Sequence, residues 1–355
     1  MGKAEEEAVL RVLRSGNLVQ GEEVKAFEEQ FAAYLGVRHA VATNSGTAAL
    51  HTALRALGVQ NGDEVILPAM TFFACAAMVA ACGARPVVVD VRPEDYNIDP
   101  DRVAEAVTAQ TKGVMAVHLY GQAADLDPLR EVMESRDLFL LEDACQAHGA
   151  RVGDSAVGSL GAAGCFSFYP TKLITTGEGG MVVTGDEALA SAARRFRNHG
   201  ARRKYEHEIL GFNYRMTDLA AAMGMAQLRK IDQFVAARRE NAAFLTKGLS
   251  DVDGIVTPSV LPDRTHVFYQ YVLRVTAEFP RSRDQVIQGL SERGVEARPC
   301  YPRPLQEQAA FDGMGRAMDC PVALALLPEM MELPVHPALS AEDLEKIVAA
   351  VNDLA

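Results

Sequence analysis

Short apolar segments alternate with amphipathic ones from about residue 40 to residue 200, and this alternation constrains the fold more than any other feature. The apolar segments do not switch between apolar and polar residues, as a strand with one exposed face does. We therefore predict an α/β fold whose mainly parallel sheet is covered by helices on both faces. The strands are expected at 65–68, 86–91, 113–119, 138–142, 165–168 and 180–184, and the helices at 47–57, 74–81, 102–109, 126–135 and 187–198.

The pattern changes after Met216, which predicts a second domain. Thr217 and Asp218 can cap a helix over 219–234, and a second helix is expected to follow it at a bend. We predict a large domain over 1–235 and a smaller C-terminal α+β domain over 236–355. The later elements are expected as helices at 236–249, 282–293 and 341–351 and a strand at 268–275.

The composition excludes several classes of function. The 355 residues carry a net charge of −12 without a prominent basic cluster, so neither nucleic acid nor an anionic membrane surface is an expected partner. The apolar runs are too short to span a bilayer. The six cysteines form no C-x-x-C pair and show no metal-ligand spacing, which favours free thiols in a reducing cytoplasm and no metal site.

Lys172 lies in a segment that reads Ser167-Phe-Tyr-Pro-Thr-Lys172-Leu-Ile-Thr-Thr-Gly-Glu-Gly-Gly180, between two strand-like runs. A lysine on a tight turn between two buried strands is well placed to form a Schiff base with a carbonyl compound. Taken alone, a lysine in such a place is more often a solvated residue of a hairpin loop. The neighbouring motifs favour the catalytic alternative.

Asp143 ends the apolar run Leu140-Leu141-Glu142-Asp143. Ligands of open α/β sheets gather at the C-terminal ends of the strands, where this carboxylate is expected. A partly buried carboxylate requires a cationic partner, and a protonated pyridine nitrogen would supply one. A helix cap or a structural ion pair is the alternative.

Two glycine-containing segments have different interpretations. Asn44-Ser45-Gly46-Thr47 opens a helix, whose free backbone N–H groups and Thr47 hydroxyl suit a phosphate, although an ordinary capped helix is the commoner use of such a sequence. The segment from Gly158 to Gly164 differs in spacing from G-x-G-x-x-G and precedes a strand, which argues against NAD. His148 is expected to be structural, because no histidine or cysteine lies at ligand spacing from it.

One cofactor, pyridoxal 5′-phosphate (PLP), would make a single site of these motifs. It requires a lysine for its aldehyde, an acid for its ring nitrogen, a phosphate cup and a flat group against the ring. We assign these roles to Lys172, to Asp143, to a cup of Gly46, Thr47 and Ser167, and to Phe72.

Together the motifs resemble the PLP-dependent nucleotide-sugar aminotransferases of the DegT/StrS family, which belong to the aspartate aminotransferase superfamily of fold type I. The resemblance covers nearly the whole chain, and its most specific parts are the Lys172 segment and Gly211-Phe-Asn-Tyr-Arg-Met-Thr-Asp218. It implies a large-domain sheet of the seven-stranded type. The other similar segments are 15–21, 44–47, 62–68, 117–121, 142–146 and 333–337.

The resemblance also implies roles for single residues. Lys172 corresponds to the cofactor-binding lysine and Asp143 to the partner of the pyridine nitrogen. Gln146 corresponds to a contact with the ring or its phenolic oxygen, Phe72 to the stacked aromatic residue, and Ser167 to a phosphate ligand, as do Gly46 and Thr47.

Further residues would contact the substrates or a second subunit. Asn213 corresponds to a phosphate contact that reaches in from the neighbouring subunit, which implies a homodimer and leaves a tetramer open. Arg215 would meet the carboxylate of the amino donor, and Tyr301 the sugar substrate. Gln306 stands where histidine is common in the family, so this segment leaves the sugar undetermined.

The expected reaction transfers an amino group from an amino acid, with glutamate as the expected donor, to a 3- or 4-keto nucleotide sugar for amino-sugar and polysaccharide biosynthesis. Lys172 would act as general acid and base. A PLP-dependent sugar dehydratase is the nearest alternative, although such relatives generally carry histidine at the lysine position. A non-catalytic regulatory protein on the same fold is the second alternative.

Overall fold

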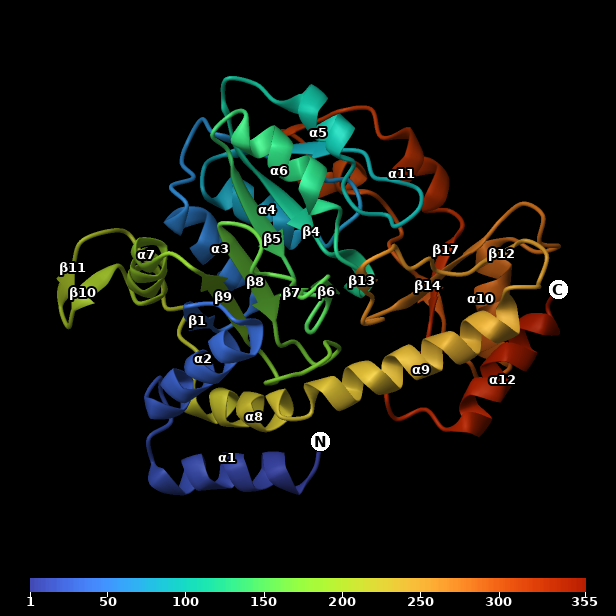
Figure 1. Cartoon of the computed structure of the whole chain (residues 1–355), viewed down its shortest axis with the longest axis horizontal. Coiled ribbons are helices and arrows are strands. Elements are labelled where there is room, and N and C mark those ends of the chain that lie inside the picture. The colour runs from blue at the N-terminus through green and yellow to red at the C-terminus, as the bar shows by residue number, and fades with distance from the viewer.

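The computed structural model describes residues 1–355 as a large sheet with its helices and a smaller sheet with its own, and the long helix α9 (Ile231–Leu249) runs from one to the other (Figure 1). The large sheet has eight strands. In spatial order they are β1 (His39–Thr43), β9 (Gly180–Thr184), β8 (Ala163–Ser167), β5 (Phe139–Asp143), β4 (Thr111–Val117), β2 (Glu64–Pro68), β3 (Arg85–Val89) and β16 (Arg316–Ala317).

The predicted mainly parallel sheet is confirmed. The strands from β8 to β16 run parallel, and β9 is antiparallel to both of its neighbours. The eighth strand, β16, departs from the expected seven-stranded type. It has two residues and comes from the C-terminal part of the chain, and a segment this short shows no recognisable pattern in the sequence.

Burial on both faces explains why the strands read as continuous apolar runs. In β2, Val65 and Leu67 belong to one core and Ile66 belongs to another. Because successive side chains of a strand point to opposite faces, both faces of the sheet need apolar residues. Helices α3 (Gly46–Ala56), α4 (Ala74–Ala81), α7 (Glu187–Arg197) and α11 (Pro321–Leu326) contribute to one core, and α2 (Glu22–Leu35), α8 (Asp218–Leu228), α5 (Pro100–Ala106) and α6 (Leu126–Glu134) contribute to the cores on the other face.

The helix that the sequence placed after Met216 begins as predicted but ends earlier. Thr217 caps α8, since its hydroxyl accepts a hydrogen bond of 3.2 Å from the backbone N–H of Ala220. The bend to α9 lies at Arg229 and Lys230, not near residue 235. No glycine or proline marks this break, so the sequence pattern could not locate it. Helix α1 (Lys3–Ser15) packs against α8.

The smaller sheet has the strand order β12 (Ile255–Val256), β14 (Tyr271–Val275), β17 (Met330–Leu333) and β15 (Arg298–Pro299), with α10 (Arg283–Glu292) and α12 (Ala341–Asn352) beside it (Figure 1). The intervening chain returns to the large sheet, because Leu305, Phe311 and Leu326 lie in the core under α3 and α4. The short helices of this returning segment are η2 (Leu305–Glu307) and η3 (Ala309–Phe311). The predicted boundary between the two domains at residue 235 stays a prediction.

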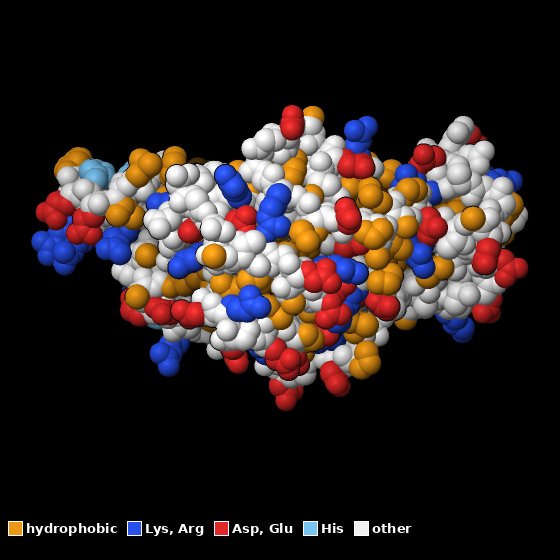
Figure 2. Space-filling view, turned by 90° about the horizontal axis from the view of Figure 1, so that it is seen from above, with side chains coloured by type: hydrophobic (Ala, Val, Ile, Leu, Met, Phe, Trp, Pro, Cys, Tyr) orange, Lys and Arg blue, Asp and Glu red, His pale blue; other side chains and the backbone are white.

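The remaining strands form small additions to the surface. The hairpin of β10 (Ala201–Arg203) and β11 (Glu206–His207) projects from one end of the molecule, and β13 (Arg264–Thr265) pairs with the hairpin of β6 (Arg151–Val152) and β7 (Ser155–Ala156) (Figure 1). Acidic and basic side chains are interspersed on the face seen in Figure 2. None of the helices combines the length and the apolar character that crossing a membrane requires.

Candidate active site

A cavity of about 700 Å³ opens at the C-terminal ends of β5 and β8. This is the edge at which open α/β sheets bind ligands. Most of the predicted site residues meet here, from segments far apart in the sequence. The lining includes Gly46, Thr47, Phe72, Asp143, Gln146, Ser167, Lys172 and Tyr301, but neither Asn213 nor Arg215.

Lys172 occupies the turn between β8 and β9, as the sequence predicted. Its backbone N–H donates to the carbonyl of Tyr169 at 2.9 Å, and its half-buried side chain reaches the cavity. The Lys172 Nζ lies 4.2 Å from the ring centre of Tyr269, and the Tyr269 hydroxyl lies 3.0 Å from the Thr171 Oγ1. The ring face therefore offers the ammonium a cation–π contact.

Asp143 ends β5 as a buried carboxylate without a cationic partner. It is 5% exposed, and no lysine, arginine or histidine forms an ion pair with it. One oxygen accepts from the backbone N–H of Cys145 at 3.0 Å, and the other accepts from the Cys75 thiol at 3.0 Å. A thiol is a weak donor, so this negative charge is poorly compensated within the chain. A cationic group of a ligand in the cavity would supply the partner that the chain lacks.

Gln146 is held in one orientation at the cavity wall. Its Oε1 accepts from the backbone N–H of Tyr120, in η1 (Leu119–Gly121), at 2.8 Å, and its Nε2 donates to the Tyr301 hydroxyl at 2.9 Å. Burial raises the pKa of Tyr301 well above its usual range, so this phenol stays neutral. The second proton of the Gln146 Nε2 remains available to a ligand.

The predicted phosphate cup lies at the start of α3. Ser45 caps this helix by accepting from the Ala48 N–H at 3.0 Å, which leaves the N–H groups of Gly46 and Thr47 for another acceptor. Ser167, at the end of β8, packs against Gly46 so closely that a Cβ on Gly46 would lie 2.6 Å from the Ser167 Cβ. Only glycine permits this approach, which brings the Ser167 hydroxyl next to the helix terminus.

Phe72 stands at the rim of the cavity and is 61% exposed. Single exposed hydrophobic side chains are ordinary at a protein surface, so the position of Phe72 in the cavity lining matters more than its exposure. A flat ring inside the cavity would cover one face of Phe72. This placement agrees with the predicted stacking role, which stays a prediction.

Asn213 and Arg215 lie outside the cavity of their own chain. The carbonyl of Asn213 accepts from the Asn44 Nδ2 at 3.3 Å, and the Asn213 side chain is exposed. The Arg215 Nη1 donates to the Asn198 Oδ1 at 2.8 Å. The contact of Asn213 from a neighbouring subunit and the role of Arg215 therefore stay predictions. Gln306 does not line this cavity either.

Sequence reasoning missed several residues of the cavity wall. Cys75, on α4, sits in an apolar run and looked like an ordinary small core residue. Tyr269 and Gln270 come shortly before β14, where their proximity to Lys172 depends on tertiary structure alone. Arg298, in β15, carried a weak signal, since it lies three residues before Tyr301.

His148 is buried next to the site and takes no part in the cavity lining. Its ring packs against Phe166 and Phe168, at centroid distances of 5.2 and 5.7 Å. Burial, and secondarily the charge of Lys172, lowers the pKa of His148 to about 3, so the ring is neutral at physiological pH. No group of three or more His, Cys, Asp or Glu side chains is arranged to hold a metal ion.

The polar groups that line the cavity match the functional groups of PLP. The unpaired Asp143 carboxylate matches a protonated ring nitrogen, Lys172 matches an aldehyde, and the N–H groups of Gly46 and Thr47 match a phosphate. The volume of about 700 Å³ leaves room for further groups beside the cofactor.

Comparison with known proteins agrees with this chemistry. The sequence profile of the DegT/DnrJ/EryC1/StrS aminotransferase family matches residues 1–352. The GDP-perosamine synthase of Caulobacter vibrioides is 41% identical over 94% of this chain and 90% of its own length, and the pleiotropic regulatory protein of Geobacillus stearothermophilus is 39% identical over 96% and 92%. Among solved structures, S. venezuelae DesV in complex with a ketimine intermediate superposes with a TM-score of 0.94 at 38% identity, over 98% of this chain and 93% of DesV.

Proposed function

Because the chain belongs to the DegT/DnrJ/EryC1/StrS aminotransferase family, we propose that it is a PLP-dependent aminotransferase that converts a keto nucleotide sugar to an amino sugar. One observation carries the proposal: a single cavity joins Lys172 to a buried carboxylate, Asp143, that has no cationic partner. A structural lysine and a structural acid would be expected to pair with each other or with other residues. Here both charges face the cavity.

The residues that would hold the cofactor follow from the contacts. We assign the aldehyde to Lys172, the ring nitrogen to Asp143, the ring face to Phe72, and the phosphate to Gly46, Thr47 and Ser167, with Gln146 beside the ring. Asn213 of a second subunit is proposed to complete the phosphate site in a homodimer. When bound, PLP supplies an electron sink that acidifies the C–H bond next to the transferred nitrogen.

The side chains of this chain carry the protons of the reaction. The Asp143 carboxylate holds the proton on the ring nitrogen. The Lys172 Nζ takes the proton from the α-carbon of the amino donor and later returns a proton to the sugar carbon that receives the nitrogen. The Tyr269 ring, 4.2 Å away, stabilises the Lys172 Nζ when it carries the proton. One lysine thus serves both half-reactions.

The substrates are proposed from the relatives and from the sequence motifs that resemble those of nucleotide-sugar aminotransferases. GDP-perosamine synthase is named for a nucleotide sugar, and we propose a 3- or 4-keto nucleotide sugar as the acceptor here, with glutamate as the donor and Arg215 and Tyr301 as substrate contacts. All six cysteines are free, which supports a place in the reducing cytoplasm.

An isotope-transfer experiment tests the proposed function. The purified protein is incubated with PLP, ¹⁵N-labelled glutamate and a panel of UDP-, dTDP- and GDP-linked keto sugars, and the products are analysed by mass spectrometry. We expect ¹⁵N in one nucleotide sugar and an equal amount of 2-oxoglutarate, and neither with Lys172→Ala.

The competing functions give different products. A dehydratase would release the nitrogen and yield a sugar that has lost a hydroxyl group and carries no label. A regulatory protein, as the name of the Geobacillus stearothermophilus relative suggests for that protein, would produce neither compound. Either result would overturn the assignment as an aminotransferase.

A further inference from the structure

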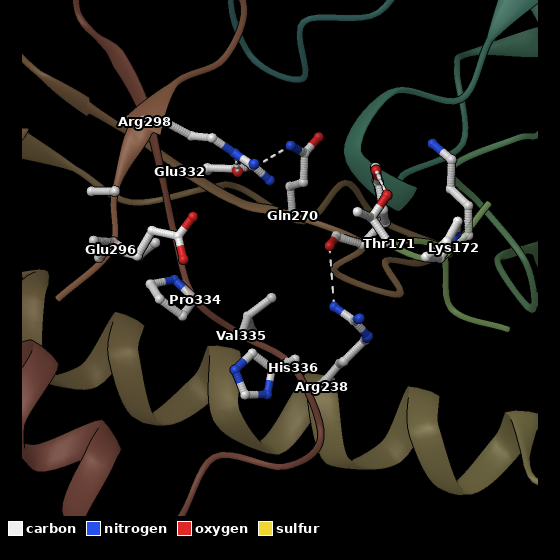
Figure 3. A pocket seen from close by; sticks show the side chains of 14 residues that line it. Thr171, Lys172, Arg238, Gln270, Glu296, Arg298, Glu332, Pro334, Val335 and His336 are labelled. Atoms are coloured by element: carbon white, nitrogen blue, oxygen red, sulfur yellow. Dashed lines mark hydrogen bonds and ion pairs between the residues drawn. The ribbon is translucent and has the colours of Figure 1, made fainter. Parts of the chain in front are cut away.

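A second cavity, of about 290 Å³, opens beside Lys172 between the turn after β8 and the smaller sheet (Figure 3). It shares Thr171, Lys172, Tyr269, Gln270 and Arg298 with the larger cavity, so the two are neighbours with a common wall. The second cavity is therefore the space next to the one that contains the Lys172 amine. We call this space the Arg238 pocket.

Arg238 gives the pocket its chemical character. It rises from α9 toward the other lining residues (Figure 3), and it is 7% exposed. Its Nη1 donates to the carbonyls of Phe268 and Tyr269, at 3.1 Å each, no acid forms an ion pair with it, and its Nε is buried without a partner. Burial lowers the pKa of Arg238 to about 10, so the guanidinium remains charged at neutral pH.

The other charges of the pocket do not neutralise Arg238. Arg298 and Glu332 pair with each other, and Glu332 also accepts from the Gln270 Nε2. Glu296, an exposed residue without an ion-pair partner, is the only other acid in the lining. Because Lys172 is assigned to the cofactor, Arg238 is the unpaired cation of this pocket, and the exposed Glu296 does not form an ion pair with it. An anion bound next to Arg238 would supply the missing partner.

We propose that the Arg238 pocket binds the side-chain carboxylate of a dicarboxylic amino donor, with Arg238 as the receptor of that carboxylate. The inference rests on the proposed aminotransfer at Lys172. A planar guanidinium can donate two parallel hydrogen bonds to one carboxylate, and the carboxylate also neutralises its charge. The backbone carbonyls that Arg238 now contacts do not neutralise this charge. A cavity of about 290 Å³ accommodates a short carbon chain, and the neighbouring cavity of about 700 Å³ would hold the cofactor and the sugar.

A purely structural role of Arg238 makes a different prediction. Arg238 also fixes the turn at Phe268, whose φ of 46° is unusual for an aromatic residue. If this were its whole role, the variants would change stability without changing selectivity between anions. The experiment therefore measures binding of a carboxylate that cannot react.

Glutarate is the probe, because it has both carboxylates of glutamate and no amino group. Calorimetry on the PLP-loaded protein should show glutarate binding more tightly than inorganic phosphate, and Arg238→Gln should weaken glutarate binding about 10- to 100-fold. The matched control is Arg239→Gln, which removes the same charge at the next position of α9 but faces a different cavity. It should change glutarate affinity less than about 2-fold.

Glu296→Gln keeps the test decisive if Arg238→Gln does not fold. Glu296 is exposed, so its replacement is not expected to disturb folding, and removing its charge should tighten glutarate binding about 2- to 5-fold. Unchanged or weaker glutarate binding would overturn the inference. Tighter binding of phosphate than of glutarate would assign the pocket to a phosphoryl group and would also overturn it.

A donor comparison separates this inference from the proposed function. Glutamate should convert the bound cofactor faster than norvaline, which has a similar length but no side-chain carboxylate, and Arg238→Gln should remove this preference. If both donors react equally well, the aminotransferase assignment stands and the pocket inference fails. If neither reacts, the proposed function and the assignment to an amino donor both fail, and glutarate binding then shows only whether Arg238 receives a carboxylate.

Discussion

The two consecutive acids at the end of β5 lie in opposite environments. Glu142 is fully buried and well compensated, because its carboxylate accepts from the His118 ring at 2.9 Å and from the backbone N–H groups of Gly158, Leu160 and Gly161 at 2.6–2.7 Å. Asp143, on the other face of the strand, has one N–H and one thiol. The glycine segment that superficially resembled a dinucleotide loop thus binds an acid of its own chain, whereas the acid beside it is left for a ligand.

The same contrast holds for buried arginines. Arg197 is 5% exposed and forms an ion pair with Glu28 while it donates to the carbonyl of Ala42 at 2.6 Å. Arg238 is 7% exposed and has only neutral acceptors. Other buried acids without an ion pair, such as Asp90 and Asp218, accept hydrogen bonds from two or more backbone N–H groups. Asp143 and Arg238 also lack an ion pair, and they lie at neighbouring cavities. The difference between buried charges with and without partners in the chain indicates where ligands bind.

Lys172→Ala should have the largest effect on the cavity. Loss of the amine removes the group that binds the aldehyde and moves the protons, so turnover should fall by at least about 10³-fold. The visible absorbance of the lysine-bound cofactor should disappear, which a spectrum of the PLP-incubated variant checks. Full activity of this variant would show that the unpaired charges do not mark a catalytic site.

Asp143→Asn should have opposite effects on the empty and the loaded protein. Without PLP the variant loses a poorly compensated buried charge, so its thermal midpoint should stay equal or rise. With PLP the protonated ring nitrogen loses its partner, and cofactor affinity should fall by about 3–5 kcal/mol. Thermal denaturation and an absorbance titration measure the two effects. A lower midpoint for the cofactor-free variant would make Asp143 a structural acid like Glu142.

The location of the site could be predicted from the sequence, because it depends on strand ends. Lys172 and Asp143 follow apolar runs, and parallel strands bring their C-terminal ends to one edge, so their meeting was predictable. That Glu142 is paired and Asp143 is not could not be predicted. The difference depends on a loop some 16 residues away that closes over one face of β5.

The sequence of α9 already places Arg238 on the buried face of the helix. The buried residues of α9 include Ile231, Val235, Ala242 and Leu245, and Arg238 falls on this apolar stripe at the spacing of a buried position. An arginine on the buried face of a helix predicts either an internal acid or a ligand. Asn213 and Arg215 lie outside the cavity of their own chain, so the proposed contact of Asn213 with the site of a second subunit and the proposed donor contact of Arg215 stay predictions.

Glu142→Gln should reverse the pattern expected for Asp143→Asn. The amide cannot accept three N–H groups and His118 as strongly as the carboxylate does, so the free energy of unfolding should fall by roughly 2–3 kcal/mol, with or without PLP. Cofactor affinity should change little, because Glu142 does not line the cavity. Urea denaturation and the same absorbance titration check both statements. A loss of cofactor affinity without loss of stability would erase the distinction between the two acids.

Substitutions of Cys75 should have the smallest effect and should refine the description of Asp143. Burial, and secondarily the Asp143 charge, raises the pKa of the Cys75 thiol well above its usual range, so the thiol keeps its proton and donates a hydrogen bond to the carboxylate. Cys75→Ser preserves a donor and should change PLP affinity less than about 2-fold, whereas Cys75→Val removes it and should weaken PLP binding by about 0.5–1.5 kcal/mol. Equal affinities in the two variants would mean that the thiol only fills space. A difference in the stated direction would mean that this weak donor orients the carboxylate, while its charge remains for the ligand to neutralise.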